Sequence, residues 1–427
     1  MSQIHVSPRL VCCATCGLVQ RRRELKEGEA ATCTRCHQTL EQRNDANIVN
    51  AMILSLASLC LLIPSNIFPI LNFNYSGQWK ENWIISGFIL LYIQGSPITA
   101  FMVFFTSVLA PIMLHVTVLL ACGSILFKKL QGISRKIWGF LFEFKEWGML
   151  DIFLVGLGVS CIKLLGMGDV STRPGLYCIF GFVLVSAFAT GLLEPKTVWN
   201  RLRSEGIEIA KRLKKSTTRT VSMTCHHCAT VLDVPEGEEN GKCPVCGTKL
   251  HTHHTYDFTQ AWLYLHSATL LYLPANLLPV MNISIKSDIG DYTVMGGIEY
   301  LWHHGDYLPA VIVFIASIIV PVGKILLLYW LFFTHKSGRS TLFKTKVFLW
   351  VKALGRWSMV DIFVLSVLVA LGQLGIVATV DPKIGAIPFC GMVVFTMLAA
   401  NSFDPRSFWI HRPGETTSIK TVELKTT

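Results

Sequence analysis

LLIPSNIFPILN, at Leu61–Asn72, returns as LYLPANLLPVMN at Leu271–Asn282, 210 residues further along the chain. Both stretches share the pattern P-x-N-x-x-P-x-x-N. Unrelated apolar segments would not keep one constant offset, so the sequence predicts a chain built from two copies of one unit. Other residues repeat at the same offset: Ser107 as Ser317, Pro111 as Pro321, Trp147 as Trp357, Asp151 as Asp361, and Trp199 as Trp409.

The composition is that of a membrane protein. Of the 427 residues, 52% are hydrophobic and 15% are charged, whereas soluble domains carry about 25% charged residues. The net charge of +11 lies in connectors beside apolar runs, as the positive-inside rule describes, and this argues against nucleic-acid binding.

Each copy contains four apolar stretches of the length that a spanning helix needs, about 17–25 residues. The eight predicted spans are Ile48–Ile70, Ile98–Phe127, Trp147–Met167, Pro174–Leu193, Phe258–Val280, Leu308–Thr334, Trp357–Val377 and Ile384–Ser402. The sequence therefore predicts an all-α polytopic membrane protein with two tandem four-helix modules.

Charge sets the predicted orientation. The connectors Phe127–Glu146 and Pro195–Asp257 are rich in lysine and arginine, and so is the connector before Trp357. The loops on the opposite side hold one lysine each, Lys80 and Lys286. We therefore expect both termini in the cytoplasm.

Two further apolar segments, Trp83–Ile93 and Val294–Trp302, are too short to cross a membrane. They are predicted to be interfacial or re-entrant pieces on the outer side, with packed outer loops as the alternative.

Each copy is preceded by two Cys-x-x-Cys pairs. Such a pair directs two sulfurs at one ion, and two pairs complete a tetrahedral shell of four thiolates. The pattern predicts two small cytoplasmic ribbons, each with a structural zinc ion; iron is the alternative metal. Cys12 is adjacent to Cys13 and could replace it as a ligand, and the ribbons could be structural, docking or regulatory. The predicted ligands are Cys13, Cys16, Cys33 and Cys36 in the first set and Cys225, Cys228, Cys243 and Cys246 in the second.

Lys324 is an ionisable residue inside a predicted span, which makes it a functional candidate. It lies about ten residues, or roughly 15 Å, from the cytoplasmic end of that span. Pro321 removes the hydrogen bond to the carbonyl of Ser317, and Ser317 shares a helix face with Lys324. The alternative is that the lysine is only a buried tether for that freed carbonyl.

Ser358, Asp361 and Thr396 are the other polar residues predicted to face the interior of the second copy. Together with Ser317 and Lys324 they could form one network across three helices, and an acid and an amine that titrate in a low dielectric suit proton coupling. The first copy keeps Asp151 but has Leu114 where the lysine should be. We therefore expect the working cavity in the second copy, with the first as scaffold or docking surface.

No nucleotide-binding or hydrolase motif is present in a suitable context. The sequence thus predicts neither an enzyme nor a nucleotide-driven pump. The competing hypotheses are a membrane redox protein with iron in the ribbons and a non-transporting anchor.

The two ribbons, the repeated P-x-N-x-x-P, S-x-x-x-P-x-x-K at Ser317–Lys324, R-W-S-M-x-D at Arg356–Asp361 and D-P-R at Asp404–Arg406 resemble the paraquat-inducible protein A family. The resemblance extends from about Cys13 to Trp409. It implies tetraspanin-like modules, zinc ribbons and a place in the inner membrane of a Gram-negative envelope. It also implies lipid transport beside a periplasmic MCE-domain protein, with proton coupling through Ser317, Lys324, Ser358, Asp361 and Thr396.

The predicted domains are a ribbon at 1–44, a module at 45–200, a second ribbon and linker at 201–256, a second module at 257–410 and a disordered tail at 411–427.

Overall fold

The computed structural model describes residues 5–6, 10–21, 29–42, 46–75, 77–126, 147–165, 168–192, 220–225, 231–235, 258–285, 288–303, 305, 307–335, 337, 340–371, 378–410, 422–423 and 425–426.

The first copy begins with a long helix and a two-stranded hairpin. A short helix follows, and then two helices that are joined without a break by a π-helical turn. Its elements are α1 (Ala46–Ile67), β6 (Leu71–Tyr75), β7 (Gln78–Asn82), α2 (Ile84–Ile93), α3 (Pro97–Phe104), the π-helical turn η1 (Phe105–Leu109), α4 (Ala110–Leu126), α6 (Leu150–Leu165), β8 (Asp169–Thr172) and α7 (Pro174–Leu192).

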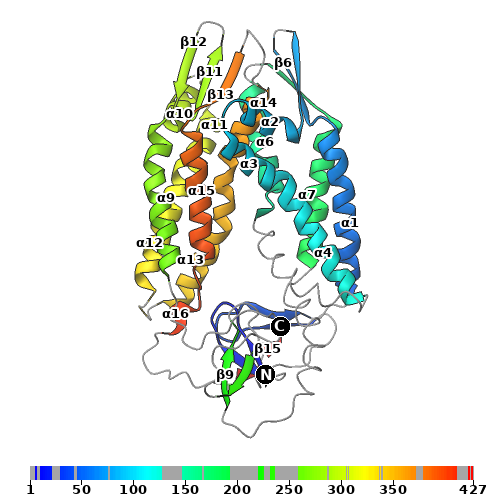
Figure 1. Cartoon of the computed structure of the whole chain (residues 1–427), viewed down its shortest axis with the longest axis vertical. Helices are drawn as coiled ribbons and strands as arrows, with labels where there is room; N and C mark the ends of the chain where they lie inside the picture. The colour runs from blue at the N-terminus through cyan, green and yellow to red at the C-terminus, as the bar shows by residue number, and fades with distance from the viewer. Residues whose placement is uncertain are drawn as a thin grey trace.

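Among the described residues, the second copy repeats this order with two further helical elements, Thr341–Leu354 and Gly355–Met359, so the duplication seen in the sequence is also a duplication of structure (Figure 1). Its elements are α9 (Thr259–Leu277), β11 (Met281–Ile285), β12 (Asp288–Tyr292), α10 (Val294–His303), α11 (Tyr307–Phe314), the π-helical turn η3 (Ile315–Ile319), α12 (Val320–Thr334), α13 (Thr341–Leu354), the 3₁₀ turn η4 (Gly355–Met359), α14 (Val360–Leu371), β13 (Ala378–Pro382) and α15 (Ala386–Asn401).

Within the described residues, five helices are long and apolar enough to cross a membrane. They run over Ile48–Ile67, Pro97–Ser124, Pro174–Leu192, Ala310–Thr334 and Thr341–Leu371. The helices predicted at the third and eighth spans are present but shorter, at Leu150–Cys161 and Ala386–Asn401.

The predicted start of the seventh span at Trp357 is wrong. The helical run begins at Thr341 and continues through η4 into α14. The basic residues of α13 misled the prediction: the buried Lys344 does not face water but donates to the carbonyls of Thr334 and Ser337, at 2.6 Å and 2.7 Å, and so caps the end of α12.

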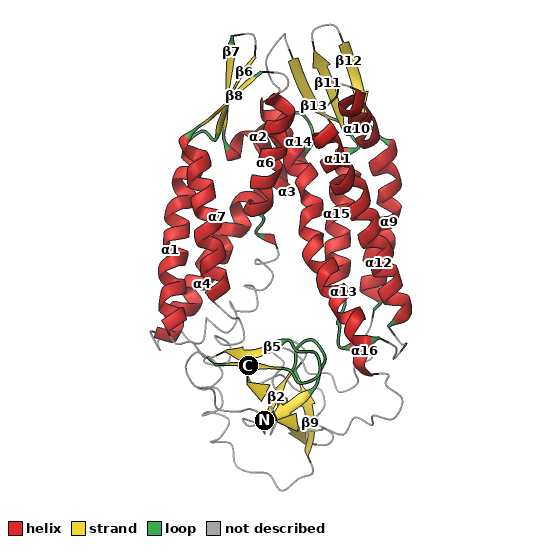
Figure 2. Cartoon of the chain, turned by 180° about the vertical axis from the view of Figure 1, so that it is seen from behind, coloured by secondary structure: helices red, strands yellow, loops and turns green. Residues whose placement is uncertain are grey.

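The all-α expectation is also incomplete, because each copy carries a three-stranded antiparallel sheet. The strand orders are β7-β6-β8 and β12-β11-β13. Leu71 pairs with Asn82 and Met281 with Tyr292 at equivalent positions. Figure 2 shows both sheets at one end of the helical bundle, here termed the sheet end.

The two short apolar segments predicted to be interfacial or re-entrant are the helices α2 and α10 beneath these sheets. Ile84, Gly87 and Leu91 of α2 are buried, and α2 packs against α3 and against α14 of the other copy. Gly87 permits that approach, since a Cβ there would overlap Ser366 Oγ.

The copies meet mainly through α6 and α14. Phe153 and Phe363 pack edge to face with ring centroids 5.5 Å apart. A Cβ on Gly156 would lie 2.9 Å from Phe363 Cβ, so the two helices are close enough to require glycine there. Within the copies, α1 packs on α7 and α9 packs on α15.

The opposite end of the molecule, here termed the ribbon end, carries the cysteine-bearing strands β2 (Leu10–Cys12), β3 (Val19–Arg21), β4 (Ala30–Thr32) and β5 (Thr39–Gln42). The N-terminal ribbon packs beneath the second copy rather than the first. Val11, Cys13 and Leu40 share a hydrophobic cluster with Phe408 and Trp409. The Arg406 Nε donates to Ala14 O at 3.0 Å, and the Arg35 guanidinium lies 4.5 Å from the Trp409 ring centroid.

The expectation of a disordered tail is wrong for four of its residues. The strand β14 (Val422–Glu423) pairs with β3, and β15 (Lys425–Thr426) pairs with β4. The strand β1 (His5–Val6) pairs with β10 (Val231–Pro235), whose other neighbour is β9 (Thr220–Thr224). Strand pairing, which is difficult to predict from sequence composition, thus joins the N-terminal strands to the strands at 220–235 and to the tail.

Candidate functional site

Lys324 is held inside the second copy with its side chain 2% exposed. Its Nζ donates to Thr396 Oγ1 at 2.9 Å, and Thr396 in turn donates to the carbonyl of Val393 at 2.8 Å. Gly355 lies against this amine, because a Cβ at that position would be 2.8 Å from Nζ. Within the described part of the chain, Lys324 forms no ion pair.

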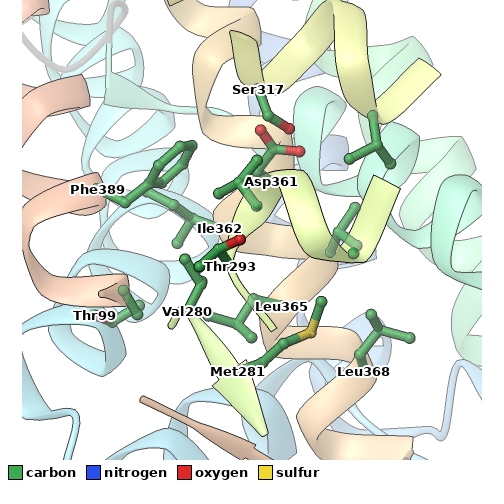
Figure 3. Close-up of a pocket in the computed structure, with 15 residues that line it drawn as sticks. Thr99, Val280, Met281, Thr293, Ser317, Asp361, Ile362, Leu365, Leu368 and Phe389 are labelled. Carbon is green, nitrogen blue, oxygen red and sulfur yellow. The ribbon is translucent and has the colours of Figure 1, made fainter. Parts of the chain in front are cut away.

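Ser317 and Asp361 line a separate cavity of about 60 Å³. In Figure 3 the two side chains point toward each other at one end of the cavity, and the apolar residues Ile362, Leu365 and Met281 lie further along it. Thr99 of the first copy contributes to the wall. The cavity is therefore mostly apolar, with one carboxylate and one hydroxyl at its end.

The backbone around Ser317 explains its position. Ser317 lies in the π-helical turn η3, and Pro321 follows one turn later. A π turn adds a residue to the helix and is common at functional sites. The turn is closed by the Val320 N–H, which donates to the carbonyl of Ile315, one residue before the proline that has no backbone N–H.

The structure thus pairs Lys324 with Thr396 and places Ser317 beside Asp361, but no hydrogen bond or ion pair of Lys324 reaches Asp361. Ser358 lies on η4, two residues from Arg356 and three from Gly355. Its Oγ is buried without a hydrogen-bond partner in the described region. The five predicted residues lie on neighbouring elements, in two separate contacts rather than one continuous network.

The first copy holds a related pair that the sequence reasoning missed. His115 Nε2 and Ser186 Oγ lie 2.9 Å apart, and His115 is completely buried. Ser186 occupies the position of Thr396 at the constant offset of 210, whereas His115 is displaced by one residue from the position of Lys324. The exact counterpart of Lys324 is Leu114, and the residue that makes the equivalent contact is the histidine beside it; its proximity in sequence did not show the contact with Ser186.

Asp151, the counterpart of Asp361, is bound to the second copy. Arg356 NH2 donates to both of its carboxylate oxygens, at 2.8 Å and 2.7 Å, and to the carbonyl of Gly148 at 3.2 Å. Both residues line a cavity of about 280 Å³ between α4, α6 and α7, with Ser186 and Thr190 as further polar wall residues. This cavity is larger than the one beside Asp361.

The N-terminal ribbon brings four cysteine sulfurs together. Those of Cys13, Cys16, Cys33 and Cys36 all lie within 4.8 Å of one another, and two sulfur pairs are separated by 3.5 Å. A tetrahedral zinc site with bonds of about 2.3 Å requires sulfurs about 3.8 Å apart. The donor set therefore fits a closed four-thiolate site.

The environment of this cluster favours the thiolate at two of the four cysteines, whereas hydrogen bonding, chiefly with Cys13, raises the pKa of Cys16 and of Cys36. Hydrogen bonding, chiefly with Cys16, lowers the pKa of Cys13 to about 7, and bonds from Cys13 and Cys16 lower the pKa of Cys33. Gln20 Nε2 also donates to the Cys33 sulfur at 3.1 Å, as outer-shell groups do around metal ligands. Four adjacent thiolates repel one another, so full ionisation calls for a bound cation.

Cys12 lies outside the cluster, with its sulfur 3.6 Å from the carbonyls of Cys13 and Gly17. In the second predicted set, Cys225 is buried, whereas Cys228, Cys243 and Cys246 lie outside the described residues.

Comparison with known proteins gives full-length relatives. Over 421 residues, 97% of this chain and 98% of the relative, it is 30% identical to the intermembrane transport protein PqiA of Escherichia coli K12. It is 28% identical over 390 residues to a probable intermembrane transport protein of Haemophilus influenzae, covering 90% and 92% of the two chains. It is 27% identical over 403 residues to the lipophilic envelope-spanning tunnel protein A of E. coli K12, covering 93% and 90%.

No solved structure matches the chain. The profile of the family described as paraquat-inducible protein A matches residues 48–203 and again 258–412, once for each copy. The chain therefore belongs to the paraquat-inducible protein A family.

Proposed function

We propose that this protein is the membrane subunit of an intermembrane lipid transport system, and that the polar residues of its second copy couple transport to proton movement. The observation that carries the proposal is Lys324, a lysine 2% exposed inside a spanning helix with a neutral hydroxyl as its hydrogen-bond acceptor. Ionisable residues in such positions are costly and mark ion pathways in membrane proteins.

The Lys324–Thr396 contact has two hydrogen-bonding states. When the amine is charged it donates to Thr396 Oγ1, and the Thr396 hydroxyl donates to Val393 O. When the amine is neutral it has a lone pair, and the Thr396 hydroxyl can turn to donate to it. Loss of one proton therefore changes a bond between α12 and α15, which is the kind of local event that biases a larger rearrangement.

The lipid cargo follows from three supporting observations. The relatives are named as intermembrane transport proteins, one relative is named as a lipophilic tunnel protein, and the cavity beside Asp361 is lined mainly by apolar side chains. We propose the inner membrane as the location, with the ribbons in the cytoplasm, and a periplasmic MCE-domain protein as the partner that receives the lipid. We propose no enzymatic reaction.

The ribbons are proposed to hold one zinc ion each. The four sulfurs of the N-terminal set support this, because their spacing suits a tetrahedral structural ion and they are buried against the second module. The modules are proposed to be tetraspanin-like four-helix units.

The test is genetic complementation of an envelope-permeability defect by Lys324→Ala and Asp361→Asn. Both variants are expected to insert at wild-type levels and to lose complementation, since each removes an ionisable group and leaves the helix intact. The matched control is Leu326→Ala, on the same helix as Lys324 but with its side chain exposed on the outer face; it is expected to complement fully. Full complementation by both second-copy variants would refute proton coupling at this site.

A further inference from the structure

We propose that the first copy forms the water-filled passage by which protons reach Lys324 from the ribbon end. This inference rests on the function proposed above. It gives the first copy, which has leucine rather than lysine at position 114, a role in proton access to the second copy.

The location of the larger cavity suits an entrance from the ribbon end. The helix α4 contributes Pro111 and Leu114, and α7 contributes residues from Phe182 to Gly191. Since α7 ends at Leu192 at the ribbon end, Ser186 is about 9 Å and Gly191 less than about 2 Å from that end of the helix. The cavity thus extends from the ribbon end into the bundle.

The charged wall of the cavity requires water. Arg356 and Asp151 remain 34% and 44% exposed although they are paired, and both line the cavity. Charged groups at such depth face bundle interiors or water-filled spaces. A space of about 280 Å³ is large enough for several water molecules.

The cavity wall is connected to Lys324 through the backbone of η4. Arg356 lines the cavity, and Gly355, its neighbour in sequence, is so close to Lys324 that a Cβ there would lie 2.8 Å from Nζ. One peptide link therefore joins a residue of the cavity wall to a residue that lies against the buried amine.

The cavity lined by Ser317 and Asp361 reaches the polar residues from the sheet end. Ser317 and Asp361 lie at one end of it, and Met281 and Thr293, at the sheet end of the molecule, lie further along it (Figure 3). Cavities thus approach the polar residues from both ends of the bundle, and the approach from the ribbon end is built mainly by the first copy.

Lys324, the proposed proton acceptor, has few ionisable groups on the elements around it. Its closest polar neighbour is the neutral Thr396. On the elements packed against α12, the ionisable residues are Arg356 on η4, Lys344, Lys346 and Lys352 on α13, Cys390 on α15, and Tyr264, His266 and Tyr272 on α9. The helix α14, which packs against the adjoining turn η3, adds Asp361. Asp361 is the carboxylate among them, so a proton that leaves Lys324 toward the sheet end has one acidic acceptor there.

The first experiment is X-ray radiolytic footprinting of the full-length protein in lipid nanodiscs, which oxidises side chains that lie next to water. Phe182 lines the cavity and is 3% exposed, whereas Phe153 is 1% exposed and packs against Phe363. We expect Phe182 to be oxidised several-fold faster than Phe153. Equal protection of both rings would show a dry cavity and overturn the proposal.

The second experiment fills the cavity. Ala187→Phe adds a ring at the cavity wall, and Leu184→Phe adds bulk on the same helix at an exposed position outside the wall. We expect Ala187→Phe to protect Phe182 from oxidation and to reduce complementation, and Leu184→Phe to change neither. Thr190→Leu serves as a second filling variant if Ala187→Phe does not accumulate in the membrane.

Full complementation by a variant whose cavity has become dry would overturn the proposal. That outcome differs from failure of the proposed function, which is full complementation by Lys324→Ala and Asp361→Asn.

Discussion

The two copies have the same order of elements and keep equivalent acids, yet they use those acids differently. In the second copy Asp361 lies beside Ser317 at the end of an apolar cavity. In the first copy Asp151 is bound by Arg356, which belongs to the second copy. The equivalent serine differs too, since Ser107 donates to the carbonyl of Val103 at 2.6 Å in the first copy. Duplication thus supplied two similar sites, and one of them became part of the junction between the copies.

The largest effect on complementation is expected when the lysine is moved from the second copy to the first. In the double variant Leu114→Lys with Lys324→Leu, the first copy gains an amine near Ser186, Asp151 and a polar cavity. We expect complementation to be lost completely, because Asp151 is already committed to Arg356 and the second copy has no amine.

The single variant Leu114→Lys is the control. It is expected to complement only in part, because the new amine stands in the wall of the proposed proton passage while Lys324 itself remains. If the double variant restored transport, the two copies would be interchangeable and the assignment of the working site to the second copy would be wrong.

A smaller effect is expected from the N-terminal ribbon, which packs against the second copy. Cys16→Ser removes one of the four clustered sulfurs, and we expect the metal content of the purified protein, measured by mass spectrometry, to fall from about two zinc ions per chain to about one. Because this ribbon packs against Phe408 and Trp409, the thermal stability of the second copy should fall as well. Cys12→Ser, whose sulfur lies outside the cluster, is expected to retain both ions, and loss of zinc from that variant would argue for a different ligand set.

The smallest expected effect concerns the junction of the copies. Gly156→Ala places a methyl group 2.9 Å from Phe363 Cβ, and overpacking of this kind costs about 1–3 kcal/mol. Gly158→Ala on the same helix meets nothing within 4 Å and should leave the melting temperature unchanged or slightly higher. Equal melting curves for the two variants would mean that α6 and α14 separate easily.

The sequence predicted most of the helices and the duplication, because long apolar runs and a constant repeat offset survive without knowledge of packing. The family was indicated by the resemblance of its short motifs. It did not predict the sheets. Strands such as Gln78–Asn82 are five residues long and polar, and their stability comes from partners such as β6 that are chosen in three dimensions.

The candidate site was predicted in its residues but not in its arrangement. Spacing placed Ser358 and Asp361 on one helical face, but it could not reveal that Lys324 bonds to Thr396 rather than to the acid. Nor could it relate His115 to Lys324, because a shift of one residue moves a side chain about 100° around a helix and only packing shows that both reach equivalent hydroxyls. The basic residues of α13 likewise favoured a connector over a helix, because the sequence does not show that Lys344 donates to two backbone carbonyls.

The attachment of the N-terminal ribbon beneath the second copy has a consequence for biosynthesis. Residues 10–42 are synthesised before their docking partners Arg406 and Trp409 and the strands at 422–426. At roughly 20 residues per second or less, that delay is about 20 s or longer. The ribbon must wait unanchored until both copies have been synthesised, so chains that stop before residue 406 would present an undocked ribbon to cellular proteases.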